Sequence, residues 1–264
     1  MKKSKKSEWV ENKEKPEKKT ASRVWIYGIH AVRDAIKNQN RVKYRFMLTQ
    51  NAHKKFKDLL ITSPLVPEVL HPRKFLPPLE RNTVHQGVAL EVSPLNWGPM
   101  SEVCAPNNNN KLVLLLDRVT DPQNVGAILR SAEVFGATAV VTAARYSAPE
   151  TGALAKAASG SLERQPYLRV PNLALAISSL KQMGYFCVGL DGSSNIDIAA
   201  DLKKIPKGPI ALIVGAEGAG LRDLTLKNCD EIFKIKSFGD FGSLNVSNAA
   251  AISLFITRTQ LNSW

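Results

Sequence analysis

The sequence predicts an α/β protein, with a mostly parallel sheet and flanking helices over residues 111–264 after a small α/β domain over 23–95. Two observations predict this fold class. From Lys111 onward, apolar runs alternate with helical segments, which is the pattern of strands joined by helices in a parallel sheet. The first of these runs, LVLLLD at 112–117, is continuously apolar up to its last residue, as expected of a strand covered on both faces.

The elements of the smaller domain are predicted from the spacing of its apolar residues, which alternate in strands and recur every three or four positions in helices. We expect a strand at 23–28, a helix at 29–38, a strand at 43–49, a helix at 53–61 and a closing strand at 87–95. Residues 96–110, which end in APNNNN, contain turn-forming residues with little periodicity, so we expect a linker there.

The same spacing predicts the elements of the larger domain. The expected strands lie at 112–117, 138–142, 185–191, 208–215 and 231–236. The expected helices lie at about 124–135, 150–159, 173–183, 221–228 and 246–258.

Positive charge is concentrated in the first part of the chain. The formal net charge is +13; residues 1–110 hold 20 Lys and Arg against 10 Asp and Glu, whereas 111–264 hold 16 against 13. A polyanionic partner, above all nucleic acid, accounts for this excess, and solubility alone is the alternative. Residues 1–22 mix Lys with Glu and have few apolar residues, so we expect a disordered basic tail.

The composition also argues against several classes of protein. No apolar run approaches the roughly 18 to 20 residues of a membrane span, and the polar N-terminus does not resemble a secretory signal. Cys104, Cys187 and Cys229 are odd in number and widely spaced, which fits the reducing cytoplasm better than a disulfide framework. No Cys and His residues have metal-ligand spacing, so we expect no metal site.

The first segment that departs from ordinary patterning is DRVTDPQNVGAILRSAEVFGA, at 117–137. Asn124 is expected at a helix start, and Gly126 shares a helix face with Arg130, four residues later. A glycine inside a helix costs about 1 kcal/mol relative to alanine, so it should have a reason. A phosphate bound at the helix N-terminus near an arginine is one interpretation. The other makes Asn124 a cap and Arg130 a surface residue.

The second segment is a glycine-rich loop, LIVGAEGAGL at 212–221, directly after an apolar strand. Such loops lie at the ligand-binding edge of parallel sheets. The spacing of Gly215, Gly218 and Gly220 does not match a dinucleotide fingerprint, and Glu217 would repel a pyrophosphate. The loop therefore suits a ligand with cationic or hydrogen-bond-donating groups, unless it is only a tight turn that needs positive φ.

The third segment, SLNVSNAAAISLF at 243–255, leads into a buried helix. Ser243, Asn245, Ser247 and Asn248 all carry polar groups, although a helix cap uses only one such residue. All three segments follow strands of one predicted parallel sheet, so we expect them to converge in space.

Together, the three segments resemble the signature of the SpoU-type RNA ribose 2′-O-methyltransferases, the TrmH family, over about residues 111–258. The residues of the first motif, Asn124, Gly126, Ala127 and Arg130, are all present, as are GAEGAGL and SLNVSNAAA. The segment GSLERQPYLRVPNLALAI is similar to the middle region of the family. In the first domain, YGIHAVRDAI (27–36) and HQGVALEV (85–92) are similar to the substrate-binding extension of the RlmB-like branch, which methylates a guanosine ribose in large-subunit (23S) rRNA.

The resemblance implies a SPOUT-type fold with a C-terminal trefoil knot, S-adenosylmethionine as methyl donor, and a homodimer with its active site near the dimer interface. It makes Arg130 the main catalytic residue. Its supporting polar residues would be Asn124, Glu217, Ser243 and Asn245. The residues expected to hold the cofactor are Gly215, Ala216, Gly218, Ile235, Leu244 and Asn245.

Arginine stays protonated in proteins, so we expect Arg130 to bind a substrate phosphate while a phosphate oxygen or water accepts the ribose proton. The alternative is Arg130 as the direct base. Basic residues of the first domain are expected to contact RNA phosphates: Lys37, Arg41, Lys43, Arg45, Lys54, Lys55 and Lys57. Three other functions stay open: a tRNA ribose methyltransferase, a non-catalytic RNA-binding protein of the same fold, and a nucleotide-dependent oxidoreductase.

Overall fold

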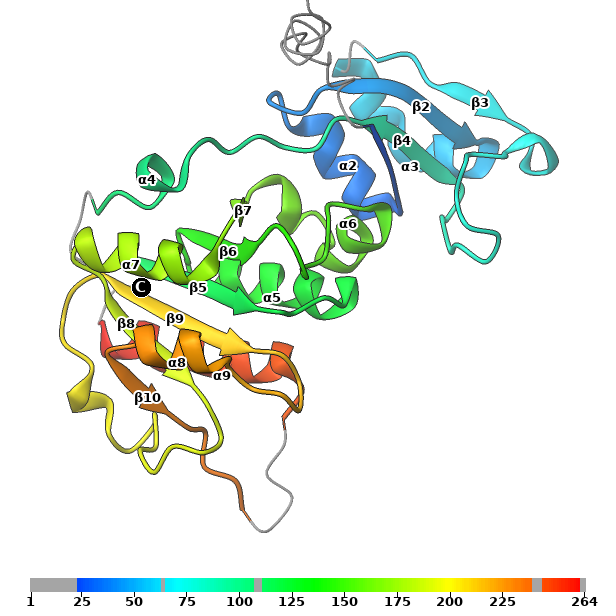
Figure 1. Ribbon diagram of the computed structural model, residues 1–264. Helices are drawn as coiled ribbons and strands as arrows, with labels where there is room; N and C mark the ends of the chain where they lie inside the picture. Colours follow the sequence, from blue (N-terminus) through cyan, green and yellow to red (C-terminus); the bar gives the residue numbers. More distant parts are fainter. Residues whose placement is uncertain (1–22, 63–64, 107–110, 239–243, 262–264) are drawn as a thin grey trace, which may run out of the picture.

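The computed structural model describes residues 23–62, 65–106, 111–238 and 244–261. The expected tail at 1–22 and the candidate Ser243 lie outside the described residues. Figure 1 shows the two sheets as separate parts of the molecule, with the smaller one at the N-terminal end.

Within the described residues, the smaller sheet has four strands in the order β1-β4-β2-β3. Its elements are β1 (Val24–Tyr27), α2 (Ile29–Lys37), β2 (Lys43–Thr49), α3 (Gln50–Thr62), β3 (Glu68–Leu70) and β4 (Val88–Val92). The central strand β4 pairs antiparallel with β1 and β2, and the short edge strand β3 pairs parallel with β2. The sequence analysis did not predict β3, whose three residues are too few to show a period.

The larger sheet has six strands among the described residues, in the order β10-β8-β9-β5-β6-β7, and its five strand pairings are parallel. Its strands are β5 (Leu112–Asp117), β6 (Ala139–Ala143), β7 (Tyr167–Val170), β8 (Phe186–Leu190), β9 (Ile210–Gly215) and β10 (Glu231–Phe233). Its helices are α5 (Pro122–Val134), α6 (Gly152–Ala158), α7 (Leu173–Gln182), α8 (Asp223–Asn228) and α9 (Val246–Gln260). The predicted parallel α/β fold is confirmed, whereas the C-terminal knot stays a prediction.

The strand β7 is absent from the sequence-based assignment because its local pattern is weak. It has four residues, and the exposed Arg169 interrupts its apolar run. Only its pairing with β6, in which Val140 lies opposite Tyr167, makes it a strand.

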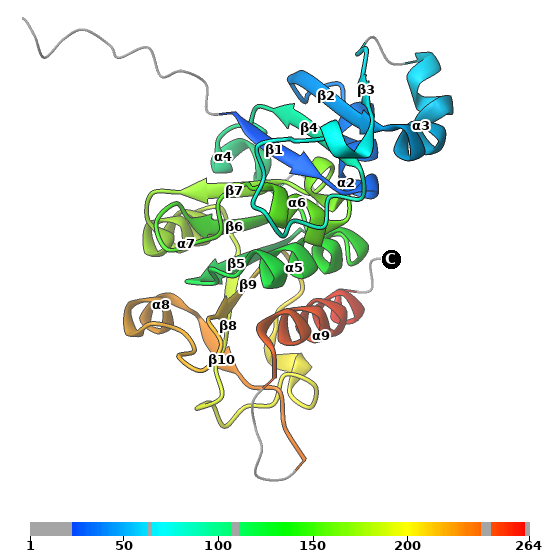
Figure 2. The same cartoon turned by 90° about the vertical axis from the view of Figure 1, so that its right-hand side faces the viewer.

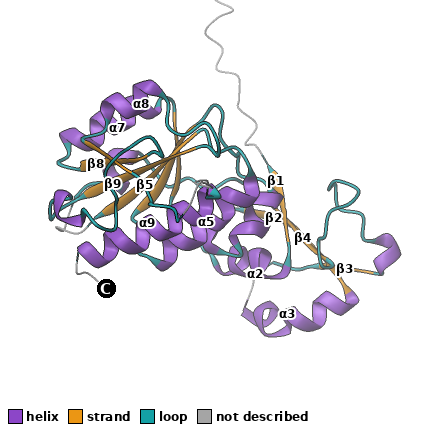
Figure 3. Ribbon diagram, turned by 90° about the horizontal axis from the view of Figure 1, so that it is seen from below, coloured by secondary structure: helices purple, strands orange, loops and turns teal. Residues whose placement is uncertain are grey.

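Helices cover both faces of the larger sheet, which explains the continuous apolar run in β5. Leu114 and Leu116 pack in the cluster that contains Leu129 of α5 and Leu254 of α9. Val113, Leu115 and their neighbours instead pack with residues of α7. Figure 3 shows the two layers, with α5 and α9 on one side of the sheet and α7 and α8 on the other.

The segment at 96–110, expected to be a linker, packs along the larger sheet where it is described. It contains the short helix α4 (Met100–Val103), and Trp97 packs against the same core cluster as Cys104. The hydroxyl group of Tyr185 donates a hydrogen bond to the carbonyl oxygen of Cys104 at 2.8 Å.

The smaller domain contacts the larger one through α6, which lies between β1 and α5 (Figure 2). Gly152 permits this approach, because a Cβ atom there would lie 2.6 Å from the Cδ1 atom of Tyr27 and still closer to Cε1 of the same ring. The amino group of Lys156 donates to the carbonyl oxygen of Val84 at 2.8 Å, which adds a polar contact from the same helix. The smaller domain is therefore packed against the larger one through α6.

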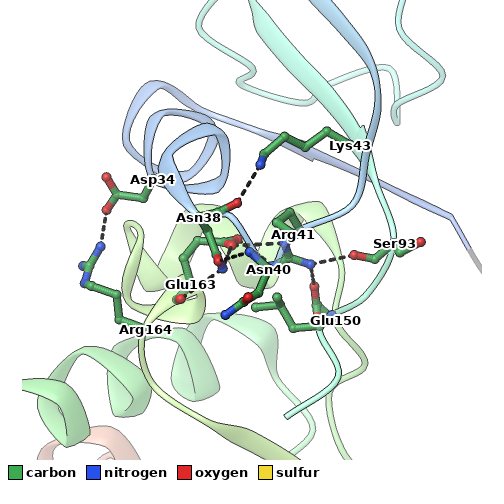
Figure 4. A network of polar contacts seen from close by, with 10 residues as sticks. Asp34, Asn38, Asn40, Arg41, Lys43, Ser93, Glu150, Glu163 and Arg164 are labelled. Atoms are coloured by element: carbon green, nitrogen blue, oxygen red, sulfur yellow. Dashed lines mark hydrogen bonds and ion pairs between the residues drawn. The ribbon is translucent and has the colours of Figure 1, made fainter. Parts of the chain in front are cut away.

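Arg41, which we expected to contact RNA, is instead buried between the two domains, and this prediction was wrong (Figure 4). Its guanidinium donates to Glu163 at 2.6 and 3.0 Å, to the carbonyl oxygen of Ser93 at 2.8 Å, and to Glu150. Burial favours loss of its proton, but the hydrogen bonds with Glu163 and the charge of Glu150 outweigh this and raise the pKa of Arg41. Its positive charge is thus neutralised by two carboxylates of the larger domain.

A second arginine bridges the domains at a more exposed position. Arg164 donates to Asp34 of α2 at 2.6 Å and to Glu133 of α5. Asn38 adds a hydrogen bond from its amide to the carboxylate of Glu163 at 2.9 Å. The smaller domain is therefore held by a network of charged side chains as well as by the apolar contact with α6.

Replacing Arg41 with methionine should lower the free energy of unfolding by about 3–5 kcal/mol, because Glu163 and Glu150 would be left buried without their partner. Urea denaturation followed by circular dichroism measures the change. The control is Arg45→Met, which breaks an ion pair with Glu68 whose side chains are about half exposed. That pair should contribute less than about 1 kcal/mol. Equal losses in the two variants would contradict the assigned role of Arg41.

Candidate active site

A pocket of about 290 Å³ lies at the carboxyl ends of β8 and β9. It is formed by four short segments that are distant in the sequence: Leu190–Gly192, Val214–Gly218 with Gly220, Lys234–Ile235, and Leu244 with Val246 and Ala249. Five of the residues expected to hold a cofactor line it, namely Gly215, Ala216, Gly218, Ile235 and Leu244. Glu217 also lines it, from the exposed tip of the glycine-rich loop.

The glycine-rich loop is a tight turn, as one of the two interpretations of its sequence proposed. Gly218 and Gly220 have φ of +79° and +62°, a region that side chains disfavour. Gly215 has no room for a side chain either, because a Cβ atom there would lie 2.6 Å from the backbone nitrogen of Leu221. The turn and the pocket are the same structure, so the two interpretations do not exclude each other.

Charged groups at the pocket come from two further residues that the sequence analysis did not select. Asp191 follows β8 and accepts hydrogen bonds from the hydroxyl group of Ser193 at 2.6 Å and the backbone of Leu221 at 3.2 Å. Burial raises the pKa of Asp191, but these hydrogen bonds outweigh it and lower the pKa below its ordinary value. Lys234 is the second of these residues, and it brings a positive charge to the lining.

The first and third motifs meet through a hydrogen bond between two asparagines. The side-chain oxygen of Asn245 caps α9 by accepting from the backbone of Ser247 at 2.9 Å. Its amide nitrogen donates to the side-chain oxygen of Asn124 at 2.9 Å. Leu244 and Val246, on either side of Asn245, both line the pocket. The asparagine pair therefore lies at the rim of the pocket, and this contact explains part of the polar surplus before α9.

The start of α5 differs from both interpretations of its sequence. The helix begins at Pro122, and its cap is Asp121, whose carboxylate accepts from the backbones of Gln123 at 3.1 Å and Asn124 at 3.3 Å. Asn124 is therefore not the cap, and its backbone N–H group is not free to bind a phosphate. A sequence signal for this start was present, because proline is favoured in the first turn after an aspartate cap.

Gly126 is required by helix packing and not by a ligand. A Cβ atom there would lie 2.7 Å from the backbone nitrogen of Ala158 in α6. The closely approaching group that the glycine admits is therefore α6, and the interpretation that assigned it to a bound phosphate was wrong.

Arg130 lies in the second half of α5, and its side chain is exposed. It is not among the described residues that line the pocket. In a single chain, the three motifs therefore bring Asn124, Asn245 and the glycine-rich loop together, whereas Arg130 stays apart from the pocket.

A residue missed by the sequence analysis holds the loop after β9 in place. The carboxylate of Asp117, at the buried end of β5, accepts from Arg222 at 2.7 and 3.2 Å and from the hydroxyl group of Thr225 at 2.7 Å. Asp117 is 1% exposed. A carboxylate at the end of an apolar strand was the available signal, because a buried charge needs a partner.

Apart from the buried Arg41, the basic residues expected to contact RNA fall into two groups in the structure. Lys37 on α2 and Lys54, Lys55 and Lys57 on α3 are exposed. Arg45 pairs with Glu68 at 2.6 and 2.9 Å, and the amino group of Lys43 donates to the carbonyl oxygen of Asn38 at 2.6 Å.

Among the residues that the structure describes, no group of three or more His, Cys, Asp and Glu side chains could hold a metal ion. None of the described helices is both long enough and apolar enough to span a bilayer.

Comparison with known proteins gives matches over most of the chain. Residues 111–255 match the SpoU rRNA Methylase family, and residues 25–98 match the RNA 2′-O ribose methyltransferase substrate-binding domain. The 23S rRNA (guanosine-2′-O-)-methyltransferase RlmB of Vibrio vulnificus is 37% identical over 241 residues, which are 89% of this chain and 96% of that protein. The protein of the same name in Pseudomonas putida is 38% identical over 237 residues, 87% of this chain and 94% of that one.

The fold is also similar to solved structures. The SpoU methyltransferase AviRb of Streptomyces viridochromogenes, solved in complex with AdoMet, has a TM-score of 0.77 at 24% identity, with 99% of each chain covered. An AdoMet-bound rRNA methyltransferase of Sinorhizobium meliloti has a TM-score of 0.72 at 23% identity, covering 90% of this chain and 88% of that one. These likenesses establish the fold.

Gly126→Ala should lower the free energy of unfolding by about 1–3 kcal/mol, because the added methyl group would press on the backbone of α6. This loss should exceed the gain of about 1 kcal/mol in helix propensity. Urea denaturation provides the measurement. The matched control is Gly192→Ala, where no atom lies within 4 Å of the added Cβ and the stability should stay within about 0.5 kcal/mol. A Gly126→Ala variant as stable as the wild type would show that α6 is not in close contact.

Proposed function

Because the chain belongs to the SpoU rRNA methylase family, we propose that it transfers a methyl group from S-adenosylmethionine to the ribose 2′-oxygen of a guanosine in 23S rRNA. The observation that carries the proposal is the pocket at the ends of β8 and β9, with the hydrogen bond between Asn124 and Asn245 at its rim. This arrangement joins the three motif segments at one edge of the sheet. Because ribosomal RNA is the proposed substrate, we also propose that the protein acts in the cytoplasm.

The residues of the pocket suit S-adenosylmethionine. Leu190, Val214 and Ile235 provide apolar surface for the adenine ring, and the tight turn at Gly215 exposes backbone groups for hydrogen bonding. The carboxylates of Asp191 and Glu217 match the positive charges of the ligand, and Lys234 matches its carboxylate. When bound, the cofactor supplies an activated methyl group, so the protein mainly has to align the ribose hydroxyl and remove its proton.

We assign the substrate side of the reaction to Arg130 and the asparagine pair. Arg130 binds a phosphate beside the reacting ribose, because a planar guanidinium forms two parallel hydrogen bonds with a phosphate. It remains protonated, so the proton of the 2′-hydroxyl passes to a phosphate oxygen or a water molecule. Asn124 and Asn245 hold polar groups of substrate or cofactor at the pocket rim. We assign the same role to Ser243 because it belongs to the third motif segment.

We propose that the protein is a homodimer, because Arg130 does not reach the described pocket of its own chain. Helices α5 and α9 lie side by side (Figure 3). They expose apolar side chains: Val134 is 74% exposed, Phe255 50% and Ile252 37%. A second copy packed on these helices would cover this surface and bring Arg130 of one protomer toward the pocket of its partner.

We assign RNA binding outside the active site to the smaller domain, residues 23–95, and methyl transfer to residues 111–264. The exposed Lys37, Lys54, Lys55 and Lys57 on α2 and α3 are the proposed phosphate contacts. Such contacts provide affinity and orientation but little sequence discrimination. Arg41 is withdrawn from this set because it is buried. Lys43 and Arg45 are left out because they already bind Asn38 and Glu68 within the smaller domain.

The decisive experiment incubates the purified protein with radiolabelled S-adenosylmethionine and unmodified transcripts of the source organism's 23S rRNA and tRNAs. We expect label at the 2′-oxygen of one guanosine of 23S rRNA, located by nuclease digestion and mass spectrometry. Label confined to tRNA would contradict the proposed substrate. Binding of S-adenosylmethionine and RNA without any transfer would indicate a non-catalytic protein.

Arg130→Lys should lower kcat by roughly 10²-fold while leaving the Kd for S-adenosylmethionine unchanged, because lysine keeps the charge but loses the planar pair of donors. Single-turnover assays with 23S rRNA measure the rate, and calorimetry measures cofactor binding. Lys227→Arg, a charge-conserving change on α8, serves as the control. Near-normal activity of Arg130→Lys would show that a positive charge alone is sufficient.

Ile252→Glu should convert a dimer into a monomer, because a charge would have to be buried in the apolar contact between protomers. Sedimentation equilibrium should give twice the chain mass for the wild type and the chain mass for the variant. Leu175→Glu, an equivalent change at a side chain 67% exposed on α7, should leave the dimer intact. A monomeric wild type would rule out the proposed dimer.

A further inference from the structure

Two residues with large side chains, at the carboxyl edge of the larger sheet, have backbone conformations that are usual only for glycine. Among the described residues, four non-glycine residues have a positive φ, and two of these are Arg118 at +60° and Tyr146 at +61°. Arg118 directly follows β5, and Tyr146 comes three residues after β6, the neighbouring strand. Left-handed backbone is costly for such residues and is concentrated at functional sites.

The two side chains stack on each other at the surface. The guanidinium carbon of Arg118 lies 5.3 Å from the centre of the Tyr146 ring. Tyr146 is 69% exposed, and Arg118 is exposed as well. An exposed pair of this kind adds little to the stability of the fold. Packing therefore does not explain why an arginine and a tyrosine occupy these two strained positions.

The surroundings of the pair are basic. Arg145 is exposed next to Tyr146, and Arg169 is exposed while its guanidinium donates to the carbonyl oxygen of Ala144 at 2.6 Å. The carboxylate of Asp117, which precedes Arg118, is buried and already bound by Arg222. Within the part of the chain that the structure describes, no carboxylate pairs with Arg118, Arg145 or Arg169, so their positive charges are available to an anionic partner.

The pair lies close to the pocket along the same edge of the sheet. Asp117, the last residue of β5, lies opposite Gly215 of β9, which lines the pocket. Arg118 is the next residue of the chain, so it lies beside the glycine-rich loop. Neighbouring strands are about 4.8 Å apart, and β6 is the next strand beyond β5. A polymer that occupies the pocket rim would therefore pass over Arg118 and Tyr146.

We propose that Arg118 and Tyr146 form a stacking platform for an unpaired RNA base adjacent to the methylated nucleotide, with Arg145 and Arg169 binding the neighbouring phosphates. This inference rests on the proposed function and specifies how its RNA substrate is held. Tyrosine rings and guanidinium planes both stack on exposed bases, and single-stranded segments are the RNA elements that present such bases. A double-stranded partner would keep its bases stacked internally and could not use the platform.

Glycine substitutions separate this role from a structural one, because glycine tolerates the left-handed backbone at both positions. Tyr146→Gly and Arg118→Gly should each raise the KM for the 23S rRNA transcript about tenfold, with kcat within twofold of the wild type. Tyr146→Phe keeps the ring and should behave like the wild type. The melting temperature should be unchanged or higher in the glycine variants, and the Kd for S-adenosylmethionine should be unchanged.

A second measurement keeps the inference testable if no methyl transfer is detected. Fluorescence anisotropy with a labelled single-stranded RNA 12-mer should show about tenfold weaker binding for Tyr146→Gly and Arg118→Gly than for the wild type. Lys227→Ala, which removes a positive charge from α8, is the control for charge and should bind normally. Weaker RNA binding in the glycine variants without any methylation by the wild type would overturn the proposed function and leave the platform intact.

Three results would overturn the platform. The first is unchanged KM and unchanged RNA affinity in both glycine variants. The second is a Tyr146→Phe variant as impaired as Tyr146→Gly, since the ring would then not be the binding group. The third is a lower melting temperature in the glycine variants, which would show that the pair stabilises the fold.

Discussion

The buried ion pairs of Arg41 are the interaction on which the relation between the two domains depends. The side chain is fully buried, and it satisfies Glu163 and Glu150, which the larger domain contributes. Removing a charged group from water is costly, so this contact is stable only when all three side chains are in place. The smaller domain therefore has one favoured position on the larger one. If its exposed lysines bind RNA as we propose, that RNA would meet the larger domain in a defined orientation.

The helix α6 connects this orientation to the candidate active site. One side of α6 contacts β1 of the smaller domain at Gly152, and the other contacts α5 at Gly126. Asn124, which bonds to Asn245 at the rim of the pocket, lies only two residues before Gly126. The helix that supports the smaller domain thus also sets the position of the first motif. Small residues at these contacts allow the close approach, because larger side chains would separate the backbones.

Residues that depart from ordinary local preferences gather at the carboxyl edge of the larger sheet. They include the asparagine pair, the tight glycine turn with Glu217 at its tip, and the left-handed Arg118 and Tyr146. Elsewhere in the sheet, strands and helices follow their apolar patterns closely. This contrast is expected when a stable framework carries a reactive site, because binding and catalysis require polar groups that packing alone would not select.

The sequence by itself determined the longer strands and helices, the parallel sheet and the convergence of three motif segments at its edge, because each of these follows from local periodicity or from the geometry of parallel strands. It did not reveal the short elements β3, α4 and β7, whose local patterns are too brief to show a period. Only the tertiary structure decided the surroundings of Arg41, Gly126 and Arg130. Arg41 and Glu163 are separated by 122 residues, and no local pattern distinguishes an arginine that meets a buried carboxylate from one that faces solvent. Gly126 is needed because α6, about 30 residues further along the chain, packs closely against it. The exposure of Arg130 depends on which faces of α5 are covered by α6 and α9. Long-range partners set the environment of each side chain, and the environment decides its chemistry.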